Sequence, residues 1–323
     1  MPHFGRIVTS TEEKITKEGA KKSRQVNKGD LILSNSMSYG LPYIMGIDGY
    51  IHDGWFVLKN FENTFDKDYL CNLLISSAIQ NQYKRLAAGG VVQNISSDLV
   101  NSVSVSIPTM MEQKKISSLL NLIDERIATQ NKIIDKLQSL IKGISSRIFA
   151  SIQGIEYRMG DIVTITNGNS NVQDAVTQSK DGLYPFFDRS EDIKYLPTFL
   201  FDKEAIIYPG EGTEFMPRYF KGKFALHQRC YAIFDFNEII NARFLYFYLK
   251  TRNSYFVKNA VGSTVPSLRL DTFQKLKVII PPKKTQHSVS SFLSSMEQKR
   301  NVEKKILYKL LNQKQYLLRQ MLI

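Results

Sequence analysis

Residues 109–150 read TMMEQKKISSLLNLIDERIATQNKIIDKLQSLIKGISSRIFA, and this stretch decides how the chain is organised. Apolar residues recur in it at spacings of four and three between charged residues, which is typical of a helix packed lengthwise against one partner helix. At 1.5 Å per residue, a helix of about 40 residues is roughly 60 Å long, more than a globular core requires. We therefore predict a spacer helix over residues 109–152. Its seam consists of Ile116, Leu120, Ile123, Ile127, the polar Gln130, Ile134, Leu137, Ile141, Ile144 and Ile148.

A related stretch returns near the C-terminus as part of an internal repeat. At an offset of 173 residues (281 − 108), Pro108 meets Pro281 and Gln113 meets Gln286. The segment LAAGGVVQNISSDLVNSVSVSIPTMMEQKKISSLLNLIDERI aligns without a gap on NAVGSTVPSLRLDTFQKLKVIIPPKKTQHSVSSFLSSMEQKR. Further upstream, NKGDLILSNS aligns on DKEAIIYPGE at an offset of 175 (202 − 27). The sequence therefore predicts two copies of one module.

Each copy reads as a globular part with short strands, followed by a long helix. Helical periodicity covers residues 69–85 in the first copy and 242–255 in the second. We predict an α+β fold in which two α/β domains are separated by two long antiparallel coiled-coil helices. The domains span 1–108 and 153–281, and the helices span 109–152 and 282–323. Strands are expected at 30–34, 55–58 and 103–107 in the first copy and at 206–208, 231–234 and 276–280 in the second.

The apolar seam of the second helix is less regular than that of the first. Positions 300, 303 and 314 carry Arg, Glu and Lys where the seam requires apolar residues. We expect the apolar stripe to rotate there through Val302 and Ile306, so that the helix pairs imperfectly or also contacts another protein. The remaining seam residues are Val289, Leu293, Met296, Leu307, Leu310, Leu317 and Met321.

The two copies differ at their openings. The segment GIEYRMGDIVTITNGNSNVQ, which opens the second copy, has no counterpart in the first. This difference predicts that the first module is shortened at its N-terminus.

Composition favours a polyanionic partner, because the 323 residues carry a formal net charge of +13 and include 16 tyrosines. No apolar run reaches the roughly 18 residues of a membrane span, and no signal peptide is evident, so we expect a cytoplasmic protein that does not contact a membrane.

Two distant cysteines and four histidines indicate neither a disulfide framework nor a metal site. No catalytic residues are expected, because the sequence has no phosphate-binding loop, HExxH or nucleophile elbow. Pro281-Pro282 follows Ile280 and thus lacks the Asn/Asp-Pro-Pro-aromatic pattern of amino-methyltransferases.

The motifs EQKKISSLLNLIDERI, TQHSVSSFLSSMEQKR, YRMGDIVTITNG and the terminal YLLRQMLI resemble the specificity subunit of Type I restriction-modification enzymes. The resemblance implies that residues 1–108 and 153–281 are target recognition domains, each reading half of a bipartite double-stranded DNA sequence. It further implies that the helices fix the gap between the halves and bind two methyltransferase (modification) subunits, through which restriction/translocase subunits join. S-adenosylmethionine, ATP and Mg are expected on those partner subunits, with no cofactor bound directly by this chain.

DNA contacts are expected from cationic, amide and hydroxyl side chains on loops, because base edges need paired donors and acceptors and phosphates need cations. The candidates in the first copy are Lys21, Lys22, Arg24, Ser34, Asn35, Ser36, Tyr39, His52, Lys84, Arg85, Gln93 and Asn94. The candidates in the second copy are Asn167, Asn169, Arg189, Glu211, Arg218, Tyr219, His227, Gln228, Arg229, Ser263, Thr264 and Arg269.

Two other functions remain to be weighed against DNA recognition. A shortened or silent specificity subunit could bind methyltransferase subunits without reading DNA productively, and the missing opening of the first copy favours this alternative. An autonomous nuclease or methyltransferase is disfavoured by the absent motifs.

Overall fold

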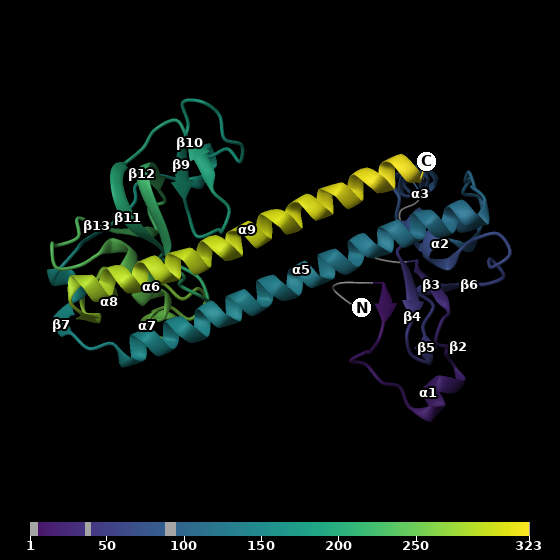
Figure 1. Ribbon diagram of the computed structural model, residues 1–323, viewed down its shortest axis with the longest axis horizontal. Coiled ribbons are helices and arrows are strands. Elements are labelled where there is room, and N and C mark those ends of the chain that lie inside the picture. The colour runs from purple at the N-terminus through teal and green to yellow at the C-terminus, as the bar shows by residue number, and fades with distance from the viewer. Residues whose placement is uncertain (1–5, 36–39, 88–94, 323) are drawn as a thin grey trace. The chain divides into compact units, whose positions relative to one another are not determined.

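A computed structural model describes residues 6–35, 40–87 and 95–322 of the chain. The structure divides into two units, each built from one copy of the repeat and the helix segments beside it (Figure 1). Unit 1 comprises Met1–Asp135 and Val302–Ile323, and unit 2 comprises Lys136–Asn301. Both units mix helices and strands, so the predicted α+β class is confirmed.

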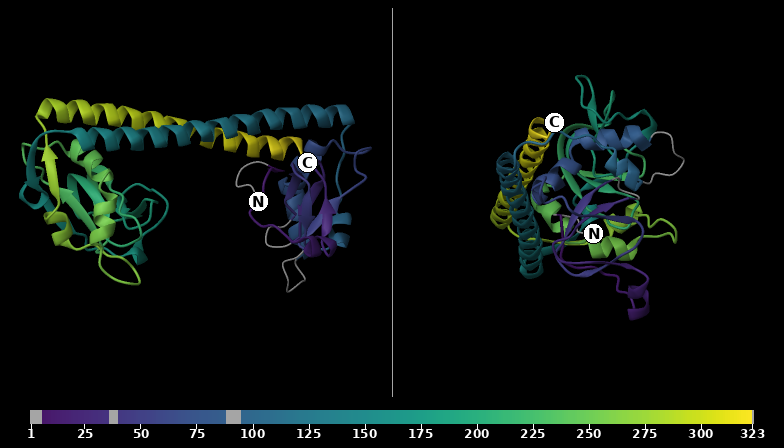
Figure 2. Two further views of the ribbon diagram at one scale, coloured as in Figure 1. Left: turned by 90° about the horizontal axis from the view of Figure 1, so that it is seen from below. Right: turned by 90° about the vertical axis from the view of Figure 1, so that its right-hand side faces the viewer.

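Unit 2 contains a six-stranded sheet in the order β10-β9-β12-β11-β13-β8, with helices packed against it (Figure 2). Its strands are β8 (Thr164–Asn167), β9 (Tyr184–Phe187), β10 (Lys194–Leu196), β11 (Phe201–Pro209), β12 (Arg218–Leu226) and β13 (Cys230–Phe234). Outside this sheet, β7 (Ile155–Arg158) pairs with β14 (Lys277–Ile280). The short helices are η1 (Met159–Asp161), η2 (Val172–Asp174), α6 (Ala242–Lys250), α7 (Asn253–Asn259) and α8 (Leu270–Gln274).

Unit 1 repeats the centre of this arrangement with a four-stranded sheet in the order β1-β4-β3-β6. Leu31 pairs with Leu58 in unit 1 as Ile206 pairs with Ile233 in unit 2, each 175 residues later. Its strands are β1 (Ile7–Val8), β3 (Leu31–Ser34), β4 (Pro42–Met45) and β6 (Trp55–Leu58), and β2 (Arg24–Val26) pairs with β5 (Gly49–Ile51). Its short helices are α1 (Lys17–Lys21), α2 (Lys67–Leu74), α3 (Ser77–Ala87) and α4 (Ser97–Asn101).

The long helices α5 (Met110–Ser151) and α9 (Lys283–Met321) lie side by side and antiparallel within each unit (Figures 1 and 2). Helix α5 starts with a capping box, in which Glu112 accepts from the Thr109 backbone N–H (3.0 Å) and Thr109 Oγ1 accepts from the Glu112 N–H (3.4 Å). In unit 2, Phe149 of α5 packs edge-on against Phe244 and Tyr248, with ring centroids 5.5 Å apart in both pairs. The long helices therefore contribute to the cores of the units.

A buried glutamine ties each long helix to the domain that precedes it. Gln113 accepts from the N–H of Asp66 (2.8 Å) and donates to the carbonyl oxygens of Thr64 (2.9 Å) and Pro108 (3.0 Å). Its counterpart Gln286 makes the same three hydrogen bonds, which confirms the predicted repeat at the level of single atoms. The partners of Gln286 are the N–H of Asn241 (2.7 Å) and the carbonyl oxygens of Ile239 (2.8 Å) and Pro281 (2.9 Å).

The predicted rotation of the α9 stripe is wrong. Every predicted seam residue of α5 and α9 is buried or partly buried, whereas Val302 and Ile306 are 45% and 40% exposed. Glu303 stays in the seam, where Gln130 donates to it, and Lys314 stays there through an ion pair with Asp124. Polar side chains can occupy a seam when they are hydrogen-bonded or paired, so the stripe has no need to rotate.

The strand predicted at 103–107 is also wrong, because these residues form no strand in the described structure. Their counterpart in unit 2 is β14, which is a strand because β7 pairs with it. The sequence pattern of an isolated strand does not show whether a partner lies beside it. Within the described ranges, no helix combines the length and apolarity needed to cross a membrane.

Candidate DNA interface

In unit 2, polar side chains gather where loops leave β8, β12 and β13. Asn167 Nδ2 donates to the carbonyl oxygen of Gln228 (3.3 Å), and the N–H of Gln228 donates to the carbonyl oxygen of Ser170 (3.1 Å). Gly168 follows Asn167 and lies so close to the last residue of β12 that an added Cβ would be 2.0 Å from the carbonyl oxygen of Leu226. The close backbone contact keeps the exposed side chains of Asn167, Asn169 and Gln228 at one end of the sheet.

Glu211, in the loop after β11, and Arg229, in the loop between β12 and β13, join these two loops. Arg229 Nη1 contacts Glu211 Oε1 (2.7 Å), and Glu211 forms an isolated bridge with Ser267. Gly210 again permits close approach, because an added Cβ would be 2.0 Å from the carbonyl oxygen of Arg229. The 261–267 loop, which carries the exposed Ser263 and Thr264, is thereby held beside Arg229. Arg269 follows Leu268, whose N–H donates to the carbonyl oxygen of Gly210 (2.8 Å).

Arg218 holds the loop that follows β9 through hydrogen bonds from its guanidinium. Its guanidinium donates to the backbone carbonyl oxygens of Asp188 and Ser190 (2.7 Å for Ser190) and lies 5.1 Å from the ring centre of Phe187. These contacts engage both terminal nitrogens of the guanidinium with the protein's own backbone. They fix the position of Arg189, whose side chain is exposed. The arrangement therefore fits a positioning role for Arg218 and a contacting role for Arg189.

Asp188 is a component of this loop that the sequence reasoning missed. The residue is 4% exposed, and its carboxylate accepts from Lys194 Nζ (2.6 Å) and from the N–H of Ser190 (2.8 Å). Burial opposes ionisation, but the hydrogen bonds from Lys194 and Ser190 outweigh it and hold the pKa of Asp188 below its ordinary value. The Asp-x-Ser spacing is typical of a turn in which the aspartate side chain bonds the backbone two residues on, and this signal could have identified it.

His227 lies among charged residues at the centre of these loops. Its Nδ1 accepts from the backbone N–H of Arg229 (3.2 Å), which leaves Nε2 as the protonated nitrogen of the neutral ring. Burial lowers the pKa of His227, and the cations Arg229 and Arg189 lower it further, whereas Asp188 and Glu211 raise it. The neutral ring thus offers Nε2–H as a donor.

His52 repeats this geometry in unit 1. Its Nδ1 accepts from the N–H of Gly54 (2.8 Å), the counterpart of Arg229 at an offset of 175. Asn35 lies beside it, with Nδ2 donating to the carbonyl oxygen of Asp53 (2.7 Å). The two histidines are separated by the repeat offset of 175 residues (227 − 52) and carry a matching hydrogen bond.

The other first-copy candidates lie at varying distances from this group. Arg24 pairs with Ile51, the residue before His52, and the exposed Lys21 and Lys22 precede Arg24 in the chain. Ser34 is buried, and its hydroxyl accepts from the N–H of Leu41 (3.0 Å). Predicted contacts that lie outside the described residues are Ser36, Tyr39, Gln93 and Asn94.

Three candidates lie away from the loop groups. Lys84 and Arg85 are exposed on the last turn of α3, and no hydrogen bond or ion pair in the described part of the chain joins them to the His52 loops. Tyr219 lies against α6, where Cζ of Arg243 is 3.8 Å from the centre of its ring, and its hydroxyl donates to the carboxylate of Glu204 on β11. The structure therefore brings the unit 2 candidates other than Tyr219 together on neighbouring loops, whereas in unit 1 the described contacts join only Asn35 and Arg24 to the segment that carries His52.

The comparison with known proteins agrees with the duplicated organisation. The model of the Type I restriction modification DNA specificity domain matches residues 4–139 and 155–312, one stretch in each copy of the repeat. The Type I restriction enzyme EcoDI specificity subunit of Escherichia coli is 28% identical over 138 residues, which are 43% of this chain and 30% of that protein. The match to this curated relative thus spans under a third of the relative's length.

Two solved structures share the fold. The S subunit of a Type-I restriction-modification system from M. genitalium has a TM-score of 0.63 at 18% identity, covering 93% of this chain and 84% of that one. A chain from work on complex assembly and conformational transition of the type I R-M system has a TM-score of 0.60 at 14% identity, covering 93% and 83%. With both copies of the repeat matched, this chain belongs to the Type I restriction modification DNA specificity domain family.

Proposed function

We propose that this chain is the DNA-binding specificity subunit of a Type I restriction-modification complex. Each unit would read one half of a bipartite double-stranded DNA target. The observation that carries the proposal is the repeated loop group, in which His52 and His227 make the same backbone hydrogen bond amid exposed polar side chains. The net charge of +13 supports it, because cations that neutralise phosphates release counterions and favour binding.

The chemistry of the loop groups suits the reading of base edges. Asn167, Gln228 and Arg229 present amide and guanidinium groups, which bond paired donors and acceptors in the major groove. Arg229 is 62% exposed in its ion pair with Glu211, so its guanidinium retains donors on its outer side. The exposed Lys21 and Lys22 suit phosphate contacts, which orient a protein on DNA without reading sequence.

The long helices would set the gap between the two half-sites. Helix α5 starts in unit 1 and ends in unit 2, and α9 runs in the opposite sense. We propose that their outer faces bind two methyltransferase subunits, through which restriction/translocase subunits join. On this proposal the chain is non-catalytic, and S-adenosylmethionine, ATP and Mg bind to the partner subunits.

Co-expression with a methyltransferase subunit, followed by methylome sequencing, tests the proposal. A bipartite methylated motif that disappears when this chain is omitted is the expected result. Copurification with the methyltransferase subunit and no methylation would favour the alternative, an interaction protein without productive DNA recognition. Methylation or cleavage by this chain alone would overturn its assignment as a recognition subunit.

A further inference from the structure

A buried carboxylate shapes the loop that joins β9 to β10 in unit 2. Asp188, the first residue of this loop, accepts from Nζ of Lys194, the first residue of β10 (2.6 Å). The same carboxylate accepts from the N–H (2.8 Å) and the hydroxyl (2.5 Å) of Ser190. Asp188 therefore ties the two ends of the 188–194 segment together and fixes the turn between them.

Further hydrogen bonds fix the backbone on both sides of Arg189. The guanidinium of Arg218 donates to the carbonyl oxygens of the residues immediately before and after Arg189. The N–H of His227 donates to the carbonyl oxygen of Phe187 (2.9 Å), which joins this loop to the one that carries His227. The peptide groups beside Arg189 are thus held in place before a ligand binds, which reduces the entropy lost on binding.

The side chain of Arg189 is available to a ligand. It is exposed, and within the described ranges its guanidinium has neither a hydrogen bond nor an ion pair. Arg218, by contrast, bonds backbone carbonyl oxygens, and Arg229 is paired with Glu211. A guanidinium presents its N–H donors in a planar fork, which matches the O6 and N7 acceptors of guanine.

The neighbouring charges favour a base edge over a phosphate as the ligand of Arg189. Glu191 and Asp192 are exposed in the same loop. Carboxylates repel phosphates, whereas in the major groove they accept from the amino group of cytosine. A loop that exposes a guanidinium beside carboxylates therefore fits a G·C base pair better than it fits the DNA backbone.

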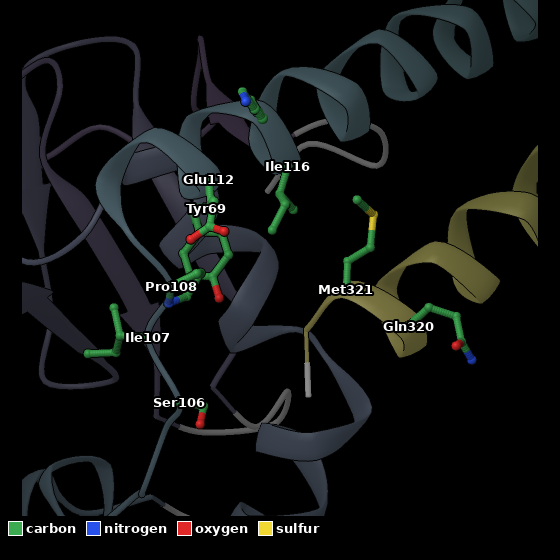
Figure 3. Close-up of a pocket in the computed structure, with 9 residues that line it drawn as sticks. Tyr69, Ser106, Ile107, Pro108, Glu112, Ile116, Gln320 and Met321 are labelled. Atoms are coloured by element: carbon green, nitrogen blue, oxygen red, sulfur yellow. The ribbon is translucent and has the colours of Figure 1, made fainter.

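A hollow of about 530 Å³ in unit 1 suits duplex DNA less well than this loop (Figure 3). It is lined in part by the apolar side chains of Ile107, Pro108 and Met321. Glu112 adds a carboxylate that accepts from the N–H (3.0 Å) and the hydroxyl (2.8 Å) of Thr109. Base edges lie inside the grooves of DNA, so an exposed loop reaches them and a hollow does not.

We propose that Arg189 reads a guanine in the half-site bound by unit 2 and that Asp188 positions it. This inference rests on the proposed DNA-binding function. The Arg189 guanidinium donates to O6 and N7 of the guanine in the major groove. Asp188 acts only through Arg189, because its own carboxylate is buried and hydrogen-bonded within the loop.

The role of Arg189 is tested in cells that express this chain with a methyltransferase subunit. Methylome sequencing gives the target of each variant, and binding of the purified complex to duplexes that differ at one base pair measures the preference. Arg189→Ala should reduce the preference for guanine at one position at least about tenfold. Arg189→Gln should favour adenine there, because a glutamine amide matches N6 and N7 of adenine. The other half-site should stay unchanged, which shows that the complex is intact.

The role of Asp188 is tested with Asp188→Asn, which keeps the shape of the side chain but removes the charge that pairs with Lys194. Alone, it should reduce the same guanine preference at least about threefold, and combined with Arg189→Ala it should have no further effect. A merely structural role would instead add to the effect of Arg189→Ala. Asp235→Asn is the matched control, because it removes the charge paired with Lys203 (2.7 Å) and should leave the target unchanged.

The failures of the inference and of the proposed function are distinguishable. Specific methylation by the wild type with an unchanged target in Arg189→Ala would overturn the inference alone. An equal loss of affinity for all duplexes would assign Arg189 to a phosphate and overturn it too, as would a target without a G·C pair. Additive effects of Asp188→Asn and Arg189→Ala would remove the positioning role. A wild-type complex that methylates no defined sequence would contradict the proposed function itself.

Discussion

Gln130 and Glu303 occupy equivalent positions of the repeat, 173 residues apart, and hydrogen-bond to each other. Gln130 Nε2 donates to Glu303 Oε2 (2.6 Å) and to the Glu303 carbonyl oxygen (3.1 Å), with the two residues 8% and 7% exposed. When two equivalent helices pair antiparallel, one level exists at which a position faces its own counterpart. Gln130 and Glu303 face each other at this level of the two helices. A buried polar pair of this kind can fix the register in which two helices of a coiled coil pair.

Replacing one member of this pair is expected to cost more than replacing both. Gln130→Leu removes two hydrogen bonds to Glu303 and should lower the free energy of unfolding by roughly 1–3 kcal/mol. The double variant Gln130→Leu/Glu303→Leu should be at least as stable as wild type, because an apolar pair avoids the desolvation cost. Thermal unfolding of the two single variants and the double variant measures the coupling. Additive effects would show that the pair contributes nothing specific.

The buried glutamines should stabilise their own units separately. Gln286→Ala removes three hydrogen bonds and leaves the Asn241 N–H and two carbonyl oxygens without this partner, at a cost of roughly 2–4 kcal/mol. Hydrogen exchange should become faster in α6, which Asn241 caps, and remain unchanged in α2. Gln113→Ala should give the reverse pattern and is the matched control. Faster exchange in both helices with either variant would contradict this assignment.

The sequence predicted the features that depend on periodicity and repetition. The seam from Ile116 to Ile148 follows from heptad spacing, and the correspondence of Gln113 with Gln286 follows from the offset of 173. Features that depend on a partner were not predictable. The 103–107 segment has the pattern of β14, but none of the strands in the described residues pairs with it. Glu303 stays in the seam because Gln130 faces it.

The candidate site was predictable in residue type but not in role. Arg218 and Arg229 are both arginines near loops, yet Arg218 bonds backbone carbonyl oxygens and Arg229 is largely exposed. That distinction depends on a tertiary contact, in which Arg218 of β12 reaches the carbonyl oxygen of Asp188, 30 residues earlier in the chain. Local sequence patterns do not encode such contacts.

Arg229→Ala is expected to weaken recognition of one half-site by about 1–3 kcal/mol if its guanidinium reads a base. Lys203→Ala is the matched control, because it also removes one cation from an ion pair in unit 2, with Asp235 (2.7 Å), but on β11 away from the loops. Binding to the methylated motif and to a scrambled duplex should be compared at two salt concentrations. Equal losses for both variants would indicate a general effect of charge.

The pH dependence of His227 should report DNA at the loop group. Its pKa in the folded protein lies below the ordinary value of about 6.5, so acidification through this range protonates the unfolded state first and reduces stability. Nearby phosphates would favour the imidazolium and raise the pKa. NMR titration of the imidazole should therefore show an upward shift on adding the target duplex. An unchanged pKa in the bound state would place the DNA away from His227, and His227→Gln identifies the resonance.

Lengthening both long helices by one heptad at the level of Gln130 and Glu303 should change the gap in the DNA target without changing the half-sites. Seven residues add about 10 Å of helix, which corresponds to roughly three base pairs at 34 Å per turn of B-DNA. The paired insertion preserves the seam, because seven residues restore the heptad phase.

Insertion into α5 alone is the control for this experiment. It shifts the seam of α5 past α9 and separates Gln130 from Glu303, so it should lower stability and abolish methylation. Methylome sequencing of cells carrying the doubly extended chain should reveal the same two half-sites with a longer gap. An unchanged gap would show that something other than the paired helices sets the spacing, even if both units still recognise their half-sites.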